Sequence, residues 1–222
     1  MYKSSVSILL LLLLVLPGCL NYEQEVSLYP DGSGDMKIKY WMEFTNRDNI
    51  ELLSKVGIFN SDSIRSQFTH EDVRIKDIVV VTDTVDSLLR AEIHIQFEHI
   101  DSLNHLRLFY ESNFSLKEGA AGQLTFSQFI PPIAIGFGID ASDFKVKYIY
   151  EFPGEIVTHN ATQVTKKQLI WEYSLPEIGK GKTISATYRP FKLKETPYWI
   201  YILSGVVLFI VIVFLFRKKR TW

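Results

Sequence analysis

Cysteine is the scarcest residue type in this chain, because Cys19 is its single example among 222 residues. A lone cysteine cannot form an internal disulfide. A metal site would need His, Cys or carboxylate side chains at ligand spacing. Of the five histidines, His94 and His99 lie five residues apart on a predicted strand and so point to opposite faces. We therefore expect no metal site and no cofactor.

The motifs of common enzyme classes are also missing. The stretch Gly179–Thr183 contains Gly-Lys-Thr but lacks the earlier glycine of a phosphate-binding loop and the helix that should follow it. Ser33 is the only serine between two glycines, and it lies in a predicted hairpin turn rather than in a nucleophile elbow. Because no nucleophile, base or metal ligand converges by spacing, we expect no enzymatic activity. An envelope hydrolase is therefore a weaker hypothesis than a ligand-binding module or a scaffold protein.

An excess of basic residues is absent from the middle of the chain. Five of the 24 Lys and Arg residues lie outside residues 20–196, and all 25 Asp and Glu residues lie within that span. The 19 basic residues that remain give this span a net charge of −6. A net-acidic domain does not have the electrostatic footprint of a nucleic-acid-binding protein, so we expect no nucleic-acid partner.

One long uncharged run is present near the C-terminus. Tyr198 to Phe216 is a stretch of 19 residues without charge, and 14 of them are Ile, Val, Leu or Phe. A helix of this length spans a hydrocarbon core at about 1.5 Å per residue. Its composition favours insertion by about 4–8 kcal/mol. The basic residues Arg217 to Arg220 follow it, which predicts a cytoplasmic C-terminus.

The N-terminus has the features of a bacterial lipoprotein signal. Lys3 provides a positive charge, Val6 to Leu16 is apolar, and Leu16 to Cys19 resembles a lipoprotein cleavage box, with an unusual proline at position 17. The position of Cys19 directly after the apolar stretch predicts that it is acylated. The alternative is an uncleaved signal anchor with an unmodified thiol.

These two ends predict a four-part organisation. We expect a lipoprotein signal peptide at 1–18, an extracytoplasmic domain at 19–196, a transmembrane helix at 197–216 and a basic cytoplasmic tail at 217–222. The predicted location is the bacterial cytoplasmic (inner) membrane, with the domain outside, lipid-anchored and single-pass. The membrane lipid bilayer is then the first expected partner.

The residues between the two ends alternate between apolar and polar with the period of β-strands. Pro30 to Gly34 separates two of these strands and predicts a hairpin. The connection Thr82 to Leu88 predicts that the strands on either side of it pair. The seven predicted strands are Glu25–Tyr29, Met36–Phe44, Val73–Thr82, Leu89–Phe97, Phe144–Phe152, Leu169–Leu175 and Ile184–Tyr188, with Leu124–Ile130 as a weaker candidate.

Helices are predicted to be few. Thr45 is a candidate cap for a helix that reaches Gly57, and a short second helix is expected over Asp62 to Phe68. Asp101 is a candidate cap for a third helix, with Leu103, Leu106 and Tyr110 on its inner face. The predicted fold is α+β: a mainly antiparallel sheet of about seven strands with helices on one side, plus one C-terminal transmembrane helix.

One segment of the domain is almost wholly apolar. It runs from Phe129 to Ile139 and is too short to span a membrane. A core strand or covered crossing segment is the favoured interpretation. The alternative is an apolar loop that enters lipid or lines a lipid-accepting groove.

Several short motifs resemble those of the LppM-type bacterial lipoprotein domain. They are Gly18-Cys19, Asp31 to Gly34, Phe152 to Val157, Asn160-Ala161 and Leu169 to Tyr173. The resemblance spans nearly the whole chain and rests mostly on turn glycines and core aromatic residues. Within it, Asn160 is a residue that can tolerate a left-handed turn conformation, and Trp171 is expected to be a large buried residue. The family implies an envelope-bound domain without known catalysis, whose mycobacterial relatives are linked to lipid or glycolipid binding.

The leading functional hypothesis is a membrane-anchored, non-enzymatic envelope lipoprotein that binds a lipid, a glycolipid or another amphipathic envelope ligand. The alternative is a scaffold or interaction subunit of an inner-membrane envelope complex, with an envelope protein as partner and Ser204 and Gly205 at helix contacts. Cys19 is the candidate lipidation site. The candidate ligand contacts are Phe129, Ile133, Ile135, Phe137, Tyr148, Tyr150 and Trp171.

Overall fold

A computed structural model describes residues 20–43, 57–83, 87–132, 144–165, 168–191 and 198–218. The chain divides into two compact units, Met1–Phe191 and Lys192–Trp222. Three sequence-based predictions lie outside the described residues: the signal peptide with Cys19, most of the helix expected at Thr45 to Gly57, and the part of the apolar segment after Pro132.

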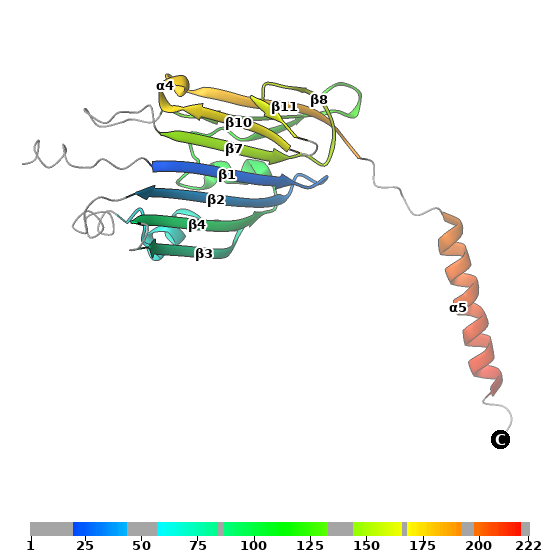
Figure 1. The fold of residues 1–222 in the computed structure, drawn as a ribbon. Coiled ribbons are helices and arrows are strands. Elements are labelled where there is room, and N and C mark those ends of the chain that lie inside the picture. The colour runs from blue at the N-terminus through cyan, green and yellow to red at the C-terminus, as the bar shows by residue number, and fades with distance from the viewer. Residues whose placement is uncertain are drawn as a thin grey trace, which may run out of the picture. The chain divides into compact units, whose positions relative to one another are not determined.

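The first unit is built around a seven-stranded sheet, called sheet A (Figure 1). Every neighbouring pair in it is antiparallel except β1 and β7, which run parallel. The sheet is therefore mixed, and β1 is its central strand. In spatial order its strands are β3 (Val73–Asp83), β4 (Leu88–Phe97), β2 (Gly34–Glu43), β1 (Leu20–Leu28), β7 (Lys145–Glu151), β10 (Gln168–Ser174) and β9 (Gln163–Val164).

The predicted hairpin joins β1 to β2. Its register pairs Leu20 with Met42 at one end and Leu28 with Gly34 at the other. Gly32 has a φ of 86°, a backbone conformation that glycine adopts without strain, and the Asp31 carboxylate accepts bonds from the backbone and hydroxyl of Ser33. This turn chemistry explains why the sequence signal for the hairpin was reliable.

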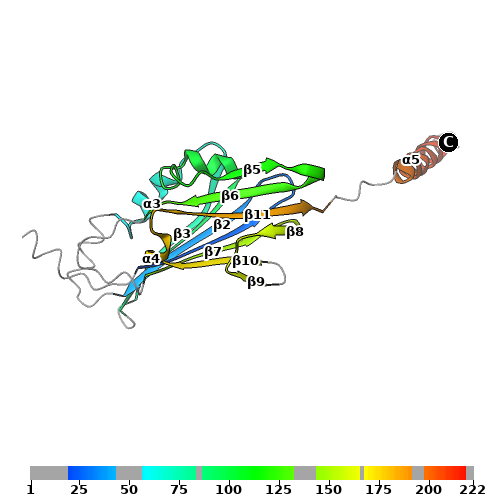
Figure 2. The same cartoon turned by 90° about the horizontal axis from the view of Figure 1, so that it is seen from above.

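A second, four-stranded sheet, called sheet B, was not predicted. It consists of β5 (Ser115–Glu118), β6 (Leu124–Ile130), β11 (Lys182–Pro190) and β8 (Gly154–His159), and all its neighbours are antiparallel. Figure 2 shows sheet B as a separate layer on one side of sheet A. The strands expected at Leu124–Ile130 and Ile184–Tyr188 are therefore present, but they pair with each other rather than with sheet A.

Short helices accompany this second layer. They are α3 (Ser61–Gln67), the 3-10 helices η1 (Ile100–His105) and η2 (Ala120–Gly122), and α4 (Leu175–Ile178). The Asn60 side chain caps α3 by accepting bonds from the backbone of Asp62 and Ser63, both at 3.0 Å. The helix predicted over Asp62 to Phe68 is thus confirmed within a residue.

The third predicted helix was partly wrong. Its residues form a 3-10 helix that ends at His105, and His99 rather than Asp101 occupies the cap position. Leu103 and Leu106 are buried as expected, but Tyr110 is 68% exposed because turns replace the helix beyond His105. Beyond His105, helical periodicity therefore does not predict which side chains face the core.

The core lies between the two layers and is rich in aromatic rings. Phe126 of β6 lies 4.6 Å from Tyr150 of β7, and Phe152 lies 5.0 Å from Tyr188 of β11, measured between ring centroids. The first contact joins sheet B to sheet A. The second joins sheet B to Phe152, the residue that follows the end of β7. The α+β fold class is therefore as predicted, with sheet B as the addition.

The second unit contains one described element, the helix α5 (Tyr198–Lys218). Tyr198–Phe216 is long and apolar enough to cross a membrane, with a mean hydropathy of 2.8, and no part of that window is buried within the protein. A soluble core helix would be covered by other elements. The Ser204 hydroxyl donates to the Ile200 carbonyl at 2.7 Å, so this polar group is satisfied inside the helix.

We predict that Gly154→Ala destabilises the domain by about 1–3 kcal/mol, because overpacking has costs of that order. A Cβ atom at Gly154 would lie 2.2 Å from the carbonyl oxygen of Arg189, a backbone atom of β11 that cannot easily move. Urea unfolding followed by circular dichroism measures the change.

The matched control is Gly119→Ala, since a Cβ there would meet its nearest neighbour at an ordinary 3.5 Å. It should change stability by no more than about 0.5 kcal/mol, as is usual for surface positions. Equal effects of the two substitutions would contradict the close approach of β8 to β11.

Candidate functional site

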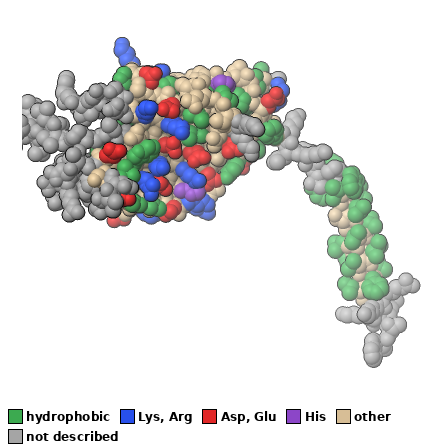
Figure 3. Space-filling model, viewed as in Figure 1, with side chains coloured by type: hydrophobic (Ala, Val, Ile, Leu, Met, Phe, Trp, Pro, Cys, Tyr) green, Lys and Arg blue, Asp and Glu red, His purple; other side chains and the backbone are tan. Residues whose placement is uncertain are grey.

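The outer face of sheet A, turned away from sheet B, carries most of the charged side chains of its central strands. Side chains alternate between the faces of a strand. Because Val26, Leu28, Met36 and Ile38 are buried on the inner face, their neighbours point outward. Figure 3 shows acidic and basic side chains intermixed on the side seen in that view.

One row across this face alternates in sign. From β10 to β4 the register places Glu172, Lys147, Glu23, Lys39 and Glu92 side by side. The Lys147 ammonium lies 3.4 Å from the Glu23 carboxylate. Opposite charges on neighbouring strands stabilise the sheet modestly and leave each ion partly hydrated.

A groove of about 390 Å³ lies over this part of the sheet. Its wall offers side chains of both charge signs, and Val79 is the large apolar side chain on it, because the side chains of Ile38 and Ile93 are buried on the inner face. This chemistry suits a polar or zwitterionic group rather than an acyl chain. The lining residues are Glu23, Glu25, Lys37, Ile38, Lys39, Asp77, Val79, Glu92, Ile93 and His94.

His94 stands at one side of the groove, between two acidic residues. Its Nε2 atom lies 3.3 Å from a carboxylate oxygen of Asp35, and Asp77 is its cross-strand neighbour on β3. Asp35 also accepts a short hydrogen bond from the Tyr29 hydroxyl, and this bond raises the pKa of Tyr29. One carboxylate therefore lies beside the imidazole, and a second acidic residue stands next to it on the neighbouring strand.

Trp41 lies on the same outer face, near the beginning of β1. Its cross-strand neighbours are Asn21 on β1 and Arg90 on β4. The Lys39 ammonium lies 5.2 Å from the centroid of its ring, within the range of a cation–π interaction. This corner of the face thus combines an aromatic ring with two cations.

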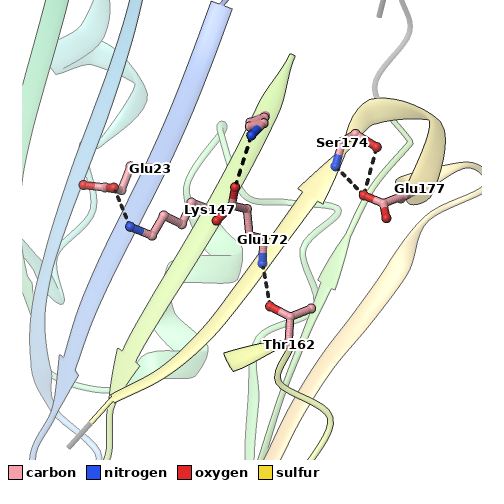
Figure 4. A network of polar contacts seen from close by, with 7 residues as sticks. Glu23, Lys147, Thr162, Glu172, Ser174 and Glu177 are labelled. Atoms are coloured by element: carbon pink, nitrogen blue, oxygen red, sulfur yellow. Dashed lines mark hydrogen bonds and ion pairs between the residues drawn. The ribbon is translucent and has the colours of Figure 1, made fainter. Parts of the chain in front are cut away.

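A smaller polar groove lies where β10 meets α4. Figure 4 shows the polar contacts of the residues around it. Glu177 accepts hydrogen bonds from the backbone and hydroxyl of Ser174, which form a capping box and lower the pKa of Glu177. The Thr162 hydroxyl accepts from the Glu172 backbone at 3.1 Å. These bonds are internal to the fold, and they account for the polar residues here as structural caps.

Three of the five predicted aromatic ligand contacts, Tyr148, Tyr150 and Trp171, lie on the inner face of sheet A. All three are buried, and Tyr150 and Trp171 form an edge-to-face pair at 5.8 Å. Burial raises the pKa of Tyr148 and of Tyr150. A ligand could contact these rings only by separating the two layers, so their contact with a ligand stays a prediction.

The structure does not bring Phe129 together with those three residues. Phe129 is half-buried and points to the other face of β6, where its ring covers Gly181: a Cβ at Gly181 would lie 2.2 Å from the ring. Ile130 is buried in the core. Ile133, Ile135 and Phe137 lie outside the described residues, so their role stays a prediction.

Sequence reasoning missed a buried polar cluster between the layers. Gln24 of β1 donates from Nε2 to the Tyr150 hydroxyl at 2.8 Å and to Gln128 of β6 at 3.3 Å, and the Tyr150 hydroxyl donates to Gln128 at 2.5 Å. Gln24 and Gln128 are 0% and 2% exposed. A signal existed in the sequence, because Gln24 interrupts the apolar alternation of Tyr22, Val26 and Leu28.

Asn160 also has a role that differs from the expected one. Asn160 does not use the left-handed turn conformation that asparagine can tolerate, since its φ is not positive. Its side-chain oxygen instead accepts from the Trp171 indole and from the Ser185 backbone, both at 2.8 Å, and its amide donates to Thr183 at 2.8 Å. Asn160 thus links β10 of sheet A to β11 of sheet B.

Another polar cluster contains Ser102, Asp72 and His70. The Ser102 hydroxyl donates to the Asp72 carboxylate at 3.1 Å, and that carboxylate lies 3.8 Å from Nδ1 of His70. In a catalytic triad the imidazole, not the carboxylate, contacts the serine. Among the described residues, no group of three or more His, Cys, Asp or Glu side chains is placed to hold a metal ion.

Comparisons with known proteins add a structural likeness. No protein-family model and no curated protein matches the chain. The structure is similar to the NMR structure of the folded domain of the LppM protein from Mycobacterium tuberculosis, with 13% sequence identity and a TM-score of 0.47. The likeness covers 80% of this chain and 94% of that domain. At these values it carries no argument about function.

We predict that Tyr150→Phe destabilises the domain by about 1–2 kcal/mol, the usual effect of deleting a hydroxyl that bonds buried polar groups. The substitution removes the phenol oxygen that accepts from Gln24 and donates to Gln128. Urea unfolding monitored by tryptophan fluorescence gives the free energy of unfolding.

Tyr188→Phe is the matched control, because the Tyr188 hydroxyl is buried without a hydrogen-bond partner among the described residues. Its removal should be neutral or stabilising, since an unsatisfied buried hydroxyl is unfavourable. A loss of stability as large as that of Tyr150→Phe would show that the polar cluster has no special role.

Proposed function

We propose that this chain is a bacterial envelope lipoprotein held by two membrane attachments, whose extracytoplasmic domain is a non-enzymatic module that binds the polar part of a lipid or glycolipid. The observation that carries the proposal is helix α5, which is an apolar run of spanning length with no residue buried inside the protein. In water that surface would be unfavourable, and in a bilayer it is the expected surface.

The ends of the helix support the membrane assignment. Tyr198, Trp199 and Tyr201 lie at its N-terminal end, where amphipathic rings prefer the headgroup zone. The basic run from Arg217 to Arg220 stands at the other end of the apolar run. A cytoplasmic basic end places the domain, which precedes the helix in the chain, outside the cytoplasm.

The N-terminal attachment would meet the domain without a spacer. Leu20, which directly follows Cys19, is already the first residue of β1 and pairs with Met42. An acyl group on Cys19 would therefore hold the central strand of sheet A against the bilayer. Lipidation of Cys19 would add a second membrane anchor to α5, and two anchors together make membrane attachment stable.

The ligand class follows from the chemistry of the outer-face groove. Lys37 and Lys39 can donate to phosphate or carboxylate oxygens, and Glu23, Glu25 and Glu92 can accept from hydroxyl or amine groups. Lipid and glycolipid headgroups present both kinds of group. The aromatic residues expected to hold an acyl chain are occupied with core packing, so the acyl chains of such a ligand would remain in the bilayer.

The apolar segment from Phe129 to Ile139 would act at the lipidated end of the domain. Before it, β6 ends at Ile130, which pairs with Lys182, and after it Val146 of β7 pairs with Tyr22 of β1. Both flanks therefore lie near the beginning of β1. Contact of Ile133, Ile135 and Phe137 with lipid is part of the proposal and rests on this chain topology.

The scaffold alternative has less support from the described residues. Ser204, the polar residue of α5 that could bond a partner helix, already donates to Ile200. A membrane complex would still appear as specific crosslinks in intact cells. No observation favours it over the binding module.

The attachments are tested by fractionation of cells that express the full chain. We expect it to incorporate radiolabelled palmitate, to lose the label on Cys19→Ser, and to stay in the membrane pellet after a carbonate wash in both forms. A chain truncated after Thr196 should remain in the pellet through Cys19, and the same truncation with residues 1–19 replaced by a cleavable secretory signal peptide should be released. Retention of that doubly altered chain would contradict the two attachments.

The ligand is tested by native mass spectrometry of the full chain released from nanodiscs of phosphatidylethanolamine and phosphatidylglycerol. Retained lipid should fall at least about tenfold in Lys37→Gln/Lys39→Gln, because a hydrogen bond to a charged group contributes about 1.5–3 kcal/mol. Lys180→Gln is the matched control, since Lys180 is exposed and does not line the groove. Equal loss in both variants would contradict the groove as the binding site.

A further inference from the structure

The charged residues that line the outer-face groove differ in whether the protein itself neutralises them. Two of the carboxylates already have a cation beside them. The Lys147 ammonium lies 3.4 Å from Glu23, as Figure 4 shows, and the Arg90 guanidinium lies 3.4 Å from Glu92. Because both cations come from outside the groove lining, these two carboxylates are partnered without any ligand.

A neighbouring row of groove residues is not neutralised in this way. The register places Glu25, Lys37, His94 and Asp77 side by side across β1, β2, β4 and β3, and all four line the groove. His94 has the Asp35 carboxylate at 3.3 Å. Within the described part of the chain, Glu25, Lys37 and Asp77 form no ion pair. This row therefore offers one cation and two anions to a ligand.

The charge balance of the groove disfavours a headgroup that is only anionic. Four of the lining residues are acidic and two are basic. A phosphate bound to Lys37 would lie near the carboxylate of Glu25, its cross-strand neighbour, since the Cβ atoms of such neighbours are only about 5 Å apart. A ligand that carries a cation beside its phosphate removes this repulsion and gives both residues an opposite charge.

The cation that fits this position is a primary ammonium. Its N–H groups can donate to the Glu25 carboxylate, which only accepts hydrogen bonds. A quaternary ammonium has no N–H group and is usually held by aromatic rings. None of the described residues that line the groove is Phe, Tyr or Trp, and the nearby Trp41 ring is already covered by the Lys39 ammonium at 5.2 Å. The chemistry matches phosphoethanolamine, in which a short ethylene link joins a phosphate to a primary ammonium.

We propose that the groove selects phosphatidylethanolamine among membrane lipids, with Lys37 bound to its phosphate and Glu25 bound to its ammonium. The inference rests on the proposed headgroup-binding function and names the headgroup. Asp77 adds a second unpaired carboxylate to the row and disfavours anionic headgroups further. Selection thus comes from two adjacent opposite charges that the fold does not pair with each other.

The test uses the full chain in nanodiscs that contain equal amounts of phosphatidylethanolamine, phosphatidylglycerol and phosphatidylcholine with the same acyl chains. Native mass spectrometry of the released protein measures each retained lipid. We expect retained phosphatidylethanolamine to exceed each of the other lipids at least about tenfold, the effect of one hydrogen bond to a charged group. Equal retention of phosphatidylglycerol would show that the ammonium is not recognised, and equal retention of phosphatidylcholine would show that its N–H groups are not. Either result would overturn the inference.

Glu25→Gln removes the charge of the side chain and keeps its size. It should lower the ratio of retained phosphatidylethanolamine to retained phosphatidylglycerol at least about tenfold, because the ammonium loses its charged acceptor. Glu151→Gln is the matched control, since Glu151 is also half-buried, lies on the neighbouring strand β7 and does not line the groove. An equal change of the ratio in both variants would contradict the role of Glu25.

Two further outcomes separate this inference from the proposed function and the lipid from a soluble source of the same group. An unaltered chain that retains no lipid would refute headgroup binding and the inference with it, whereas retained lipid without preference would refute the inference alone. Glycerophosphoethanolamine at the concentration of the lipid should not displace phosphatidylethanolamine, because a lipid in the same bilayer as the chain has a high effective concentration. Displacement would overturn the lipid as the ligand.

Discussion

Tyr150 is the residue on which the two layers of the domain depend. Its ring packs against Phe126 of sheet B and Trp171 of sheet A, while its hydroxyl completes a hydrogen-bonded cluster with Gln24 and Gln128. Such a cluster is favourable only when every member finds its partner, since a buried amide without a hydrogen bond is costly. The relative position of the sheets is therefore specified by geometry as well as by apolar packing.

The register of β1 connects this interior to the proposed binding surface. Gln24 must face inward to meet Tyr150, so Glu23 and Glu25 must face outward, where Lys39 and Lys37 are their cross-strand neighbours. A slip of one residue would bury two carboxylates and expose the amide. The core and the charged face are thus two consequences of one alternating pattern.

In the proposed attachment, the same central strand links the domain to the membrane. Because Leu20 is already paired in the sheet, a lipid anchor on Cys19 would act on a paired strand rather than on a flexible tether. The proposed headgroup-binding groove would gain from such an anchor, because a surface held near its ligand experiences a high effective concentration.

The sequence by itself determined the elements that depend on local chemistry. The membrane-span character of residues 198–216, the β1–β2 hairpin and the alternating strands follow from composition, turn residues and a period of two, none of which needs knowledge of distant contacts. The fold class and most core residues followed from the same patterns. The membrane attachments and the ligand remain predictions.

Only the tertiary structure decided how the strands divide into two sheets, where Asn160 directs its side chain, and which residues share a surface. Lys39 and Glu92, or Gln24 and Gln128, come together because strands distant in the chain pair and layers pack. Alternation states which side chains share a face of one strand, but not which strand lies beside it. That choice depends on packing between layers, a non-local interaction that leaves no periodic trace in the sequence.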